Sequence, residues 1–248
     1  MKKIIAVGGG QIGYANIKNE TLGIDREIIK LSGKTNPKLL FIPTASGDAT
    51  GYIESVQNYF GKKLGCKVDS LELITKKYTK KELEDKILKT DIVYVGGGNT
   101  LKMMKVWRKF GVDLLLEKAM KKGTVLSGLS AGSICWFQYG NSDSARFGKN
   151  KEASMIRVKG LNMIPVLHCP HFDIGDREES LKEMMKKSKG VAIAIDNCAA
   201  IEIIGDEYRI LKTKKTANAY KVFWKNGKYH KELILAKSKL QKMNELLK

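Results

Sequence analysis

A serine lies between two glycines in the segment Gly128-Leu129-Ser130-Ala131-Gly132. An apolar, strand-like run from Thr124 to Ser127 precedes this segment, and a helix-like run from Ala131 to Phe137 follows it. A sharp strand-to-helix turn lifts a serine hydroxyl off the sheet, and free N–H groups at the helix start point toward a developing oxyanion. The pattern predicts a nucleophilic Ser130, although with 24 glycines in the chain the bare spacing also arises by chance.

A nucleophilic serine needs a base, and the chain contains three histidines. His230 lies in a polar segment, which is typical of a surface residue. His168 and His171 flank Cys169-Pro170 at the end of an apolar run, and sites in open α/β sheets form at the carboxyl ends of strands. We expect His171, just past the strand, to be the base, and His168 to point into the core or to bond the backbone.

A second glycine-rich turn is expected to contribute to the site. The run Val95-Gly96-Gly97-Gly98-Asn99-Thr100 ends one expected strand and begins a helix. Glycines let a ligand approach the backbone closely, and their N–H groups can form an anion-binding nest. We expect this turn to supply an oxyanion donor beside the N–H of Ala131, with Asn99 as a candidate substrate-binding residue. The alternative is a tight strand-to-helix connection without a chemical role.

Two other patterns suggest cofactors, and both fit poorly. His168, Cys169, His171 and Asp173 are metal-ligating types, but their spacing is neither that of a zinc knuckle nor that of the two-histidine helical motif. Gly8 to Gly13 matches the G-x-G-x-x-G dinucleotide pattern, but no convincing helix follows and no acidic residue ends the second strand. We expect neither a metal nor another cofactor.

Strand-like runs alternate with amphipathic, helix-like runs through most of the chain. Strands are expected at 3–7, 38–42, 67–73, 91–95, 124–127, 166–168, 191–195 and 199–204. Helices are expected at 25–31, 52–64, 79–88 and 100–121, the last with a candidate break at Gly111, and at 236–247, while the polar stretch 139–162 is predicted to be a long loop. The alternation predicts a three-layer α/β sandwich around a mostly parallel sheet, built as one domain over residues 1–248.

The composition is that of an ordinary globular protein, but the formal net charge is +19. The excess is mostly lysine spread along the chain, which favours solvated lysine-rich faces over a nucleic-acid-binding surface. No run approaches the ~20 apolar residues of a membrane span, and the apolar N-terminal run breaks at Gly8, too early for a signal sequence. Four cysteines without C-x-x-C spacing are expected to be buried free thiols in a cytoplasmic protein.

Three segments taken together resemble the dipeptidase E and cyanophycinase family of serine peptidases. They are Ile92 to Thr100, Gly128 to Gly132, and Pro170-His171-Phe172, in an order and spacing that extend over roughly positions 38–204. The resemblance implies a flavodoxin-like fold similar to that of class I glutamine amidotransferases, with a serine in place of the nucleophilic cysteine.

The resemblance also implies roles for individual residues. Ser130 would be the nucleophile and His171 the base, with oxyanion donors at Gly98 and Ala131. In the aspartyl dipeptidases of this family an arginine downstream of the histidine holds the acidic side chain of the substrate, and Arg177 stands near that place.

The third member of the implied triad departs from the family pattern. An acidic residue usually follows a strand there, and the corresponding stretch here runs from Ile193 to Asn197, with Asn197 where the acid falls. Asp196, Asn197 and Asp143 remain alternatives. Neighbouring residues of an extended strand point to opposite faces, so only one of Asp196 and Asn197 can face the base. We favour Asp196, because a carboxylate also stabilises an imidazolium.

We therefore expect a dipeptidase E-like serine peptidase that acts on small peptides, without nucleic-acid or membrane partners and with homodimerisation left open. The segment before Lys38 does not resemble the dipeptidases closely, which leaves aspartyl specificity open. One alternative is a degenerate amidotransferase-like binding or regulatory protein, which a fluorophosphonate would not label. Another is a basic nucleic-acid-binding protein, whose affinity would fall steeply with salt.

Overall fold

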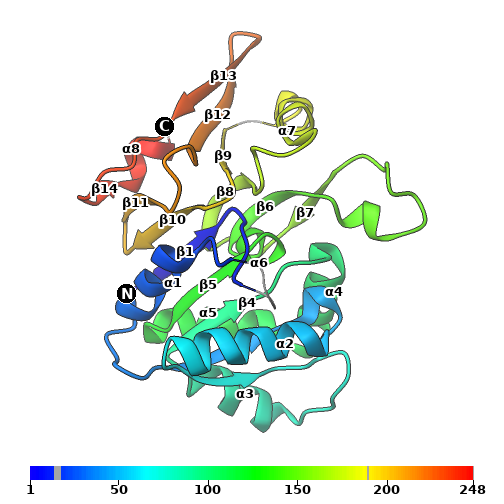
Figure 1. The fold of residues 1–248 in the computed structure, drawn as a ribbon. Helices are drawn as coiled ribbons and strands as arrows, with labels where there is room; N and C mark the ends of the chain where they lie inside the picture. Colours follow the sequence, from blue (N-terminus) through cyan, green and yellow to red (C-terminus); the bar gives the residue numbers. More distant parts are fainter. Residues whose placement is uncertain (14–17, 189, 248) are drawn as a thin grey trace.

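The computed structural model describes residues 1–13, 18–188 and 190–247, and its strands form two sheets (Figure 1). The strands of the larger sheet are β1 (Lys3–Val7), β2 (Lys38–Ile42), β3 (Lys67–Ser70), β4 (Ile92–Val95), β5 (Val125–Leu129), β10 (Ala199–Ile204), β11 (Glu207–Lys212) and β14 (Gln241–Lys242). Their order is β14-β11-β10-β1-β5-β4-β2-β3. The five strands from β1 to β3 in this order are parallel, and the other three pair antiparallel to their neighbours.

Helices cover both faces of the parallel strands. The helices are α1 (Leu22–Leu31), α2 (Thr50–Val56), α3 (Lys80–Leu88), α4 (Thr100–Phe110), α5 (Val112–Lys122), α6 (Ala131–Ile134), α7 (Arg177–Lys186) and α8 (Met243–Leu247). Successive side chains of β1 enter different apolar clusters: Ile5 and Val7 pack with α1 and α2, whereas Ile4 and Ala6 pack with α3, α4 and α5. The predicted three-layer α/β sandwich around a mostly parallel sheet is therefore confirmed.

The expected helices of the first half are present, with local differences. The helix expected at 52–64 consists of α2 and a π-helical continuation, Gln57–Lys63. Thr79 caps α3 by accepting a hydrogen bond from the Glu82 N–H at 3.2 Å. The helix expected at 100–121 is broken at Gly111, whose φ of 70° places it in the left-handed region that glycine adopts without strain.

A second, six-stranded sheet was not predicted. Its strands are β6 (Phe137–Ser142), β7 (Ile156–Lys159), β8 (Ile164–Cys169), β9 (Val191–Ile195), β12 (Ala219–Lys225) and β13 (Lys228–Leu233). Their order is β13-β12-β9-β8-β6-β7, in which β6, β8 and β9 run parallel. Figure 1 shows β12 and β13 at the opposite end of the molecule from α2 and α3.

The prediction of a long loop at 139–162 is wrong, because the segment contains most of β6, a 3₁₀ helix at Ser144–Phe147, and β7. The strand β6 was not predicted because several of its residues are polar. Asn141 is buried and donates through Nδ2 to Ser180 Oγ at 2.9 Å, and Ser142 is buried against Thr100. Polar side chains that find partners inside the fold do not mark a loop.

The strand expected at 67–73 ends at Ser70, and two helix predictions were also too long. The helix expected from Ala131 to Phe137 ends at Ile134, and Phe137 already begins β6. The helix expected at 236–247 is reduced to α8. Among the helices of the described residues, we find none with the length and apolar character that a bilayer crossing requires.

The two sheets share one apolar core, which contains Ile4 of the larger sheet and Phe137 and Ile193 of the smaller one. The chain passes from one sheet to the other four times, first between β5 and β6, then between β9 and β10, and later between β11 and β12 and between β13 and β14. Ser130 lies in the first of these connections and Asn197 in the second. The candidate site therefore lies where the two sheets meet.

Candidate active site

Ser130 occupies the turn between β5 and α6, with backbone angles φ 56° and ψ −113°. A positive φ is unfavourable for a residue with a Cβ, so the surrounding structure must hold this turn in place. A Cβ on Gly128 would lie 2.5 Å from the Val95 carbonyl oxygen, and one on Gly132 would lie 2.1 Å from it. Both flanking glycines are thus needed for the tight packing of the turn on the end of β4.

Three consecutive carbonyl groups at the end of β1 connect the three segments of the site. The N–H groups of Ser130, His171 and Cys198 donate to the carbonyls of Val7, Gly8 and Gly9, in that order, at 3.2, 3.1 and 2.9 Å. Segments from distant parts of the chain are therefore attached to one short stretch of backbone. This stretch sets the spacing between the candidate nucleophile, the candidate base and the β9–β10 turn.

Gly9 has no room for a side chain, because the site fills the space beside it. A Cβ at this position would lie 2.1 Å from Asn197 Oδ1 and 2.3 Å from His171 Nδ1. In the sequence the glycine run resembles only a weak dinucleotide motif, and this role was not predicted. The available signal was its location directly after the first strand, at the carboxyl edge of the sheet.

His171 forms a close pair with Asn197, whose Oδ1 lies 2.7 Å from the ring Nδ1. An amide oxygen only accepts hydrogen bonds, so Nδ1 carries the proton and Nε2 is left with a free lone pair. Burial lowers the pKa of His171, while the bond to Asn197 opposes this effect and the nearby Arg177 adds to it. The lowered pKa favours the neutral ring, which is the form that can accept a proton.

Asn197 is itself held by a carboxylate. Its backbone N–H donates to Asp173 Oδ1 at 2.8 Å, and its side-chain Nδ2 donates to the same oxygen at 3.1 Å. The spacing of Asp173 in the sequence suggests only a poorly fitting metal cluster, so its contact with Asn197 was not predicted. In the described part of the chain, no three histidine, cysteine or acidic side chains lie close enough together to hold a metal ion.

The expectation that Asp196 faces His171 is wrong, because Asn197 takes that place. Asp196 is buried on the other side of the β9–β10 turn, where its Oδ2 accepts the Asn218 N–H at 2.9 Å. Its backbone N–H also donates to the Asn218 carbonyl, at 3.0 Å. These bonds to the residue before β12 fix the turn. Burial raises the pKa of Asp196 to about 6.

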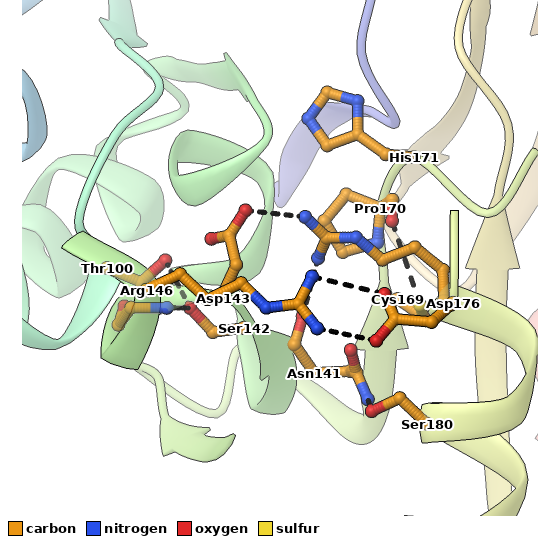
Figure 2. Close-up of polar contacts among 12 residues, drawn as sticks. Thr100, Asn141, Ser142, Asp143, Arg146, Cys169, Pro170, His171, Asp176 and Ser180 are labelled. Atoms are coloured by element: carbon orange, nitrogen blue, oxygen red, sulfur yellow. Dashed lines mark hydrogen bonds and ion pairs between the residues drawn. The ribbon is translucent and has the colours of Figure 1, made fainter. Parts of the chain in front are cut away.

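Asp143 and Arg177 form an ion pair beside the site. Arg177 Nη2 donates to Asp143 Oδ2 at 2.6 Å, and Arg177 is buried at the start of α7. Arg146 makes a two-pronged contact with Asp176, so two ion pairs join the segment after β6 to the start of α7. Figure 2 shows this polar network on one side of His171. The structure therefore brings neither Asp143 to the His171 ring nor Arg177 to the lining of the cavity described next.

Ser130, His171, Asp173 and Asn197 line one cavity of about 830 Å³. Other residues of its wall are Gly10, Gln11, Ile12, Glu20, Ala49, Gly51, Tyr52, Ser55, Gly97, Leu129, Ile174 and Lys214. Lys214 pairs with Glu20 across this wall. The candidate nucleophile and the candidate base thus open onto the same space, which has the size of a small-molecule pocket.

The glycine-rich turn after β4 approaches Ser130 through Gly97, which belongs to the cavity wall. The Gly97 N–H donates to Tyr52 Oη at 3.4 Å. Gly98 has a φ of 134°, and a Cβ there would lie 2.3 Å from the Ala45 carbonyl oxygen, so this position requires glycine. Asn99 instead caps α4 by accepting the Lys102 N–H at 2.9 Å, and the structure does not bring it to the cavity.

His168 is a core residue, as expected. Its Nδ1 bonds the Ile193 carbonyl and its Nε2 bonds Ser133 Oγ, each at 2.9 Å, and its ring stacks on Phe137. Burial lowers its pKa to about 3. His230 lies half-buried on β13 with its ring stacked on Phe223, away from the cavity.

Comparisons with known proteins agree with this geometry. The sequence profile of peptidase family S51 matches residues 4–211. The chain is 34% identical over 225 residues to a Bacillus subtilis protein described as "uncharacterized peptidase YgaJ". The aligned region covers 90% of this chain and 92% of that protein. It is 29% identical over 185 residues to "uncharacterized peptidase Lmo0363" of Listeria monocytogenes, over 71% of this chain and 85% of that one.

Solved structures show the same fold. A peptidase from an acI-B1 actinobacterium superposes with a TM-score of 0.69 at 16% identity, over 98% of this chain and 97% of that one. A putative peptidase E protein from Listeria monocytogenes EGD-e superposes with a TM-score of 0.64 at 23% identity, over 86% of this chain and 98% of that one. Both likenesses support the flavodoxin-like sandwich described above.

Proposed function

Since the chain belongs to peptidase family S51, and is thereby a serine-type peptidase, we propose that it cleaves small peptides in the cavity that contains Ser130. The observation that carries this proposal is the strip of carbonyls from Val7 to Gly9, which holds the serine turn, the histidine and the asparagine turn together. A cavity of this size accommodates a small ligand rather than a folded protein chain.

The proposed reaction is acyl transfer to Ser130. His171 Nε2 takes the hydroxyl proton as Ser130 attacks the peptide carbonyl, and the ring later gives a proton to the leaving amine. Asn197 Oδ1 keeps the ring in the tautomer that this step requires. Water then releases the acyl group by the same base-assisted route.

The proposed oxyanion donors are the N–H groups of Ala131 and Gly98. Ala131 is the first residue of α6, so its N–H has no carbonyl within the helix to bond. Gly97 rather than Gly98 lines the cavity, but its N–H already bonds Tyr52 Oη, so we propose the N–H of the next residue, Gly98, as the donor from this turn. Two preorganised donors of this kind commonly supply a large part of the rate in acyl transfer.

The substrate preference is proposed to differ from that of the aspartyl dipeptidases. Arg177 is paired with Asp143, and Lys214 in the cavity wall is paired with Glu20. An acidic substrate side chain would have to displace one of these carboxylates. We therefore propose activity on small peptides without a requirement for an acidic residue. Arg177 would then support the site indirectly, through its ion pair with Asp143 and through its positive charge, which lowers the pKa of His171.

Labelling with a fluorophosphonate and hydrolysis of a dipeptide and activated-ester panel test this function. The wild-type protein should be labelled and should turn over at least one class of substrate. Ser130→Ala should lose both properties with a nearly unchanged melting temperature, because only a hydroxyl is removed. A variant that keeps more than a few per cent of the activity would contradict the assignment of Ser130.

A degenerate, amidotransferase-like binding protein remains the second candidate, and the amide of Asn197 at the third triad position favours it. An amide orients a histidine but offsets the imidazolium charge less well than a carboxylate does. A wild-type protein that binds small peptides but resists the fluorophosphonate would support this candidate.

A cytoplasmic location is also part of the proposal. All four cysteines are buried and free, as the sequence predicted, and such thiols persist in reducing compartments. Immunodetection in cell fractions checks the location.

A further inference from the structure

We propose that Asp173 is a positioning residue that holds Asn197 in the single orientation in which His171 can act as a base. This inference rests on the proposed peptidase function of the same site. Asp173 follows His171 by two residues, in the loop between β8 and α7, and contacts Asn197 from the side opposite the histidine ring.

An asparagine differs from a carboxylate as a histidine partner because its two ends have opposite hydrogen-bonding properties. With Oδ1 toward the ring, as here, His171 Nδ1 carries the proton and Nε2 can accept one. With the NH₂ group toward the ring, Nδ1 would have to accept and Nε2 would carry the proton. The ring could then not take a proton from Ser130, so the amide orientation decides whether the site functions.

The Asp173 carboxylate selects the productive orientation. Asn197 Nδ2 lies 3.1 Å from Asp173 Oδ1 and 3.3 Å from Oδ2, and the Asn197 N–H donates to Oδ1 at 2.8 Å. An ionised carboxylate accepts hydrogen bonds and cannot donate them. A flipped amide would turn its oxygen toward this carboxylate and would exchange a charge-assisted bond for a repulsive contact.

The two residues together carry one negative charge, as a single acidic residue in the third triad position would. Burial lowers the pKa of His171, and the charges of Asp143 and Asp173 oppose this effect while that of Arg177 adds to it. A carboxylate placed directly at position 197 would face Asp173 across a hydrogen-bonding distance. Asparagine avoids this repulsion. It bonds both the ring and the carboxylate, so the negative charge of Asp173 lies close enough to His171 to oppose the lowering of its pKa.

Asp173 is exposed and lines the cavity, so the rival role is direct binding of a substrate amino group. The two roles separate in a double-mutant cycle. If Asp173 acts through Asn197, Asp173→Ala should lower kcat by about tenfold or more in the wild-type background and hardly at all in Asn197→Ala. Glu84→Gln, which removes an exposed carboxylate from α3, is the matched control. Equal losses in both backgrounds, or a rise in KM confined to substrates with a free amino group, would overturn the proposal.

A charge swap adds a test by rescue. Asp173→Asn alone replaces an acceptor-only carboxylate by an amide that can bond either end of Asn197, so the orientation is no longer selected. Asn197→Asp alone places two carboxylates together, so both variants should be impaired. The double variant Asp173→Asn/Asn197→Asp restores one carboxylate and one amide in exchanged places, with the carboxylate on the ring. It should be more active than either single variant, and a double variant no better than the worse single one would count against the pairing.

The tautomer of His171 gives a readout that needs no catalysis. In nitrogen-15 NMR spectra at neutral pH, with His171→Ala assigning the signal, the wild-type ring should be protonated at Nδ1. Asp173→Ala should raise the fraction protonated at Nε2, and an unchanged tautomer would overturn the proposal. If the wild-type protein hydrolyses nothing, the proposed function fails, yet this spectrum still decides whether Asp173 positions Asn197 and His171.

Discussion

Two histidines three residues apart lie in opposite environments. His168 at the end of β8 is fully buried, and both of its ring nitrogens have partners in the core. His171 bonds through one nitrogen to Asn197 and lines the cavity together with Ser130. Among the described residues, only the second arrangement leaves a ring nitrogen without a hydrogen-bond partner, so that it can exchange a proton with a ligand. The surroundings of each ring, rather than the residue type, separate a candidate base from a structural residue.

The backbone contributes to this difference. His168 continues the regular pairing of β8, opposite Ile193 of β9. His171 has a φ of 52°, in a region that few side-chain-bearing residues adopt, and its N–H is held by the Gly8 carbonyl. The chain thus accepts a strained residue where the ring must face the cavity, which is common at functional sites.

Substitution of His171 should have the largest effect, a loss of activity that substitution of His168 does not cause. His171→Ala should lower kcat/KM by about 10³-fold or more, close to the loss in Ser130→Ala, because the members of a triad act as a unit. The free energy of unfolding should change little, since the ring lies at the edge of a cavity. Hydrolysis assays and urea denaturation measure the two quantities. Substantial residual activity in His171→Ala would remove the contrast on which the site assignment depends.

The opposite pattern is expected for His168. His168→Leu removes two buried hydrogen bonds and the stacking on Phe137, and should lower the free energy of unfolding by roughly 2–4 kcal/mol. The activity of the molecules that remain folded should stay close to that of the wild type. A large loss of kcat without a loss of stability would assign the base to His168 instead.

The pH dependence of stability sharpens this prediction. Burial lowers the pKa of His168 from 6.5 to about 3, so the unfolded chain binds a proton there before the folded protein does. The stability contributed by the neutral ring is present above pH 6.5 and is lost as the pH falls toward 3. The difference between wild type and His168→Leu should therefore shrink as the pH is lowered. Asp25 and Asp196, whose pKa values are raised to about 6, titrate with the opposite sign but cancel in this difference.

The sequence predicted the parallel half of the fold because most of its strands are largely apolar and its helices have clear ends. The buried β1 and the capped α3 are examples. It failed to predict β6 because the buried Asn141 and Ser142 find their partners on α7 and α4, and such partners are visible only in the folded structure. Tertiary contacts of this kind override local composition.

Part of the candidate site was likewise predictable from the sequence, and part was not. The sequence pattern correctly predicted that Ser130 lies in a turn between a strand and a helix, and His171 follows β8 as the rule for carboxyl ends of strands predicts. The partner of His171 could not be chosen from the sequence, because alternation of side chains holds only for an extended chain and the structure has a turn there. The contact that orients this turn comes from Asn218, in the last part of the chain.

The smallest expected effect on activity is that of Asp196→Asn, and it should differ from the effect of substituting the neighbouring Asn197. Asp196→Asn keeps an oxygen that can accept the Asn218 N–H, so kcat/KM should fall less than about threefold. Asn197→Ala removes the partner of His171 Nδ1 and should lower kcat/KM by about tenfold or more.

Because burial raises the pKa of Asp196 to about 6, its contribution to stability is present at acidic pH and is lost as the pH rises through 6. Asp196→Asn should therefore be relatively more stable above pH 6 than below pH 4. Urea denaturation at both pH values checks this sign, and a loss of activity in Asp196→Asn as large as that in Asn197→Ala would show that both residues of the turn serve the base.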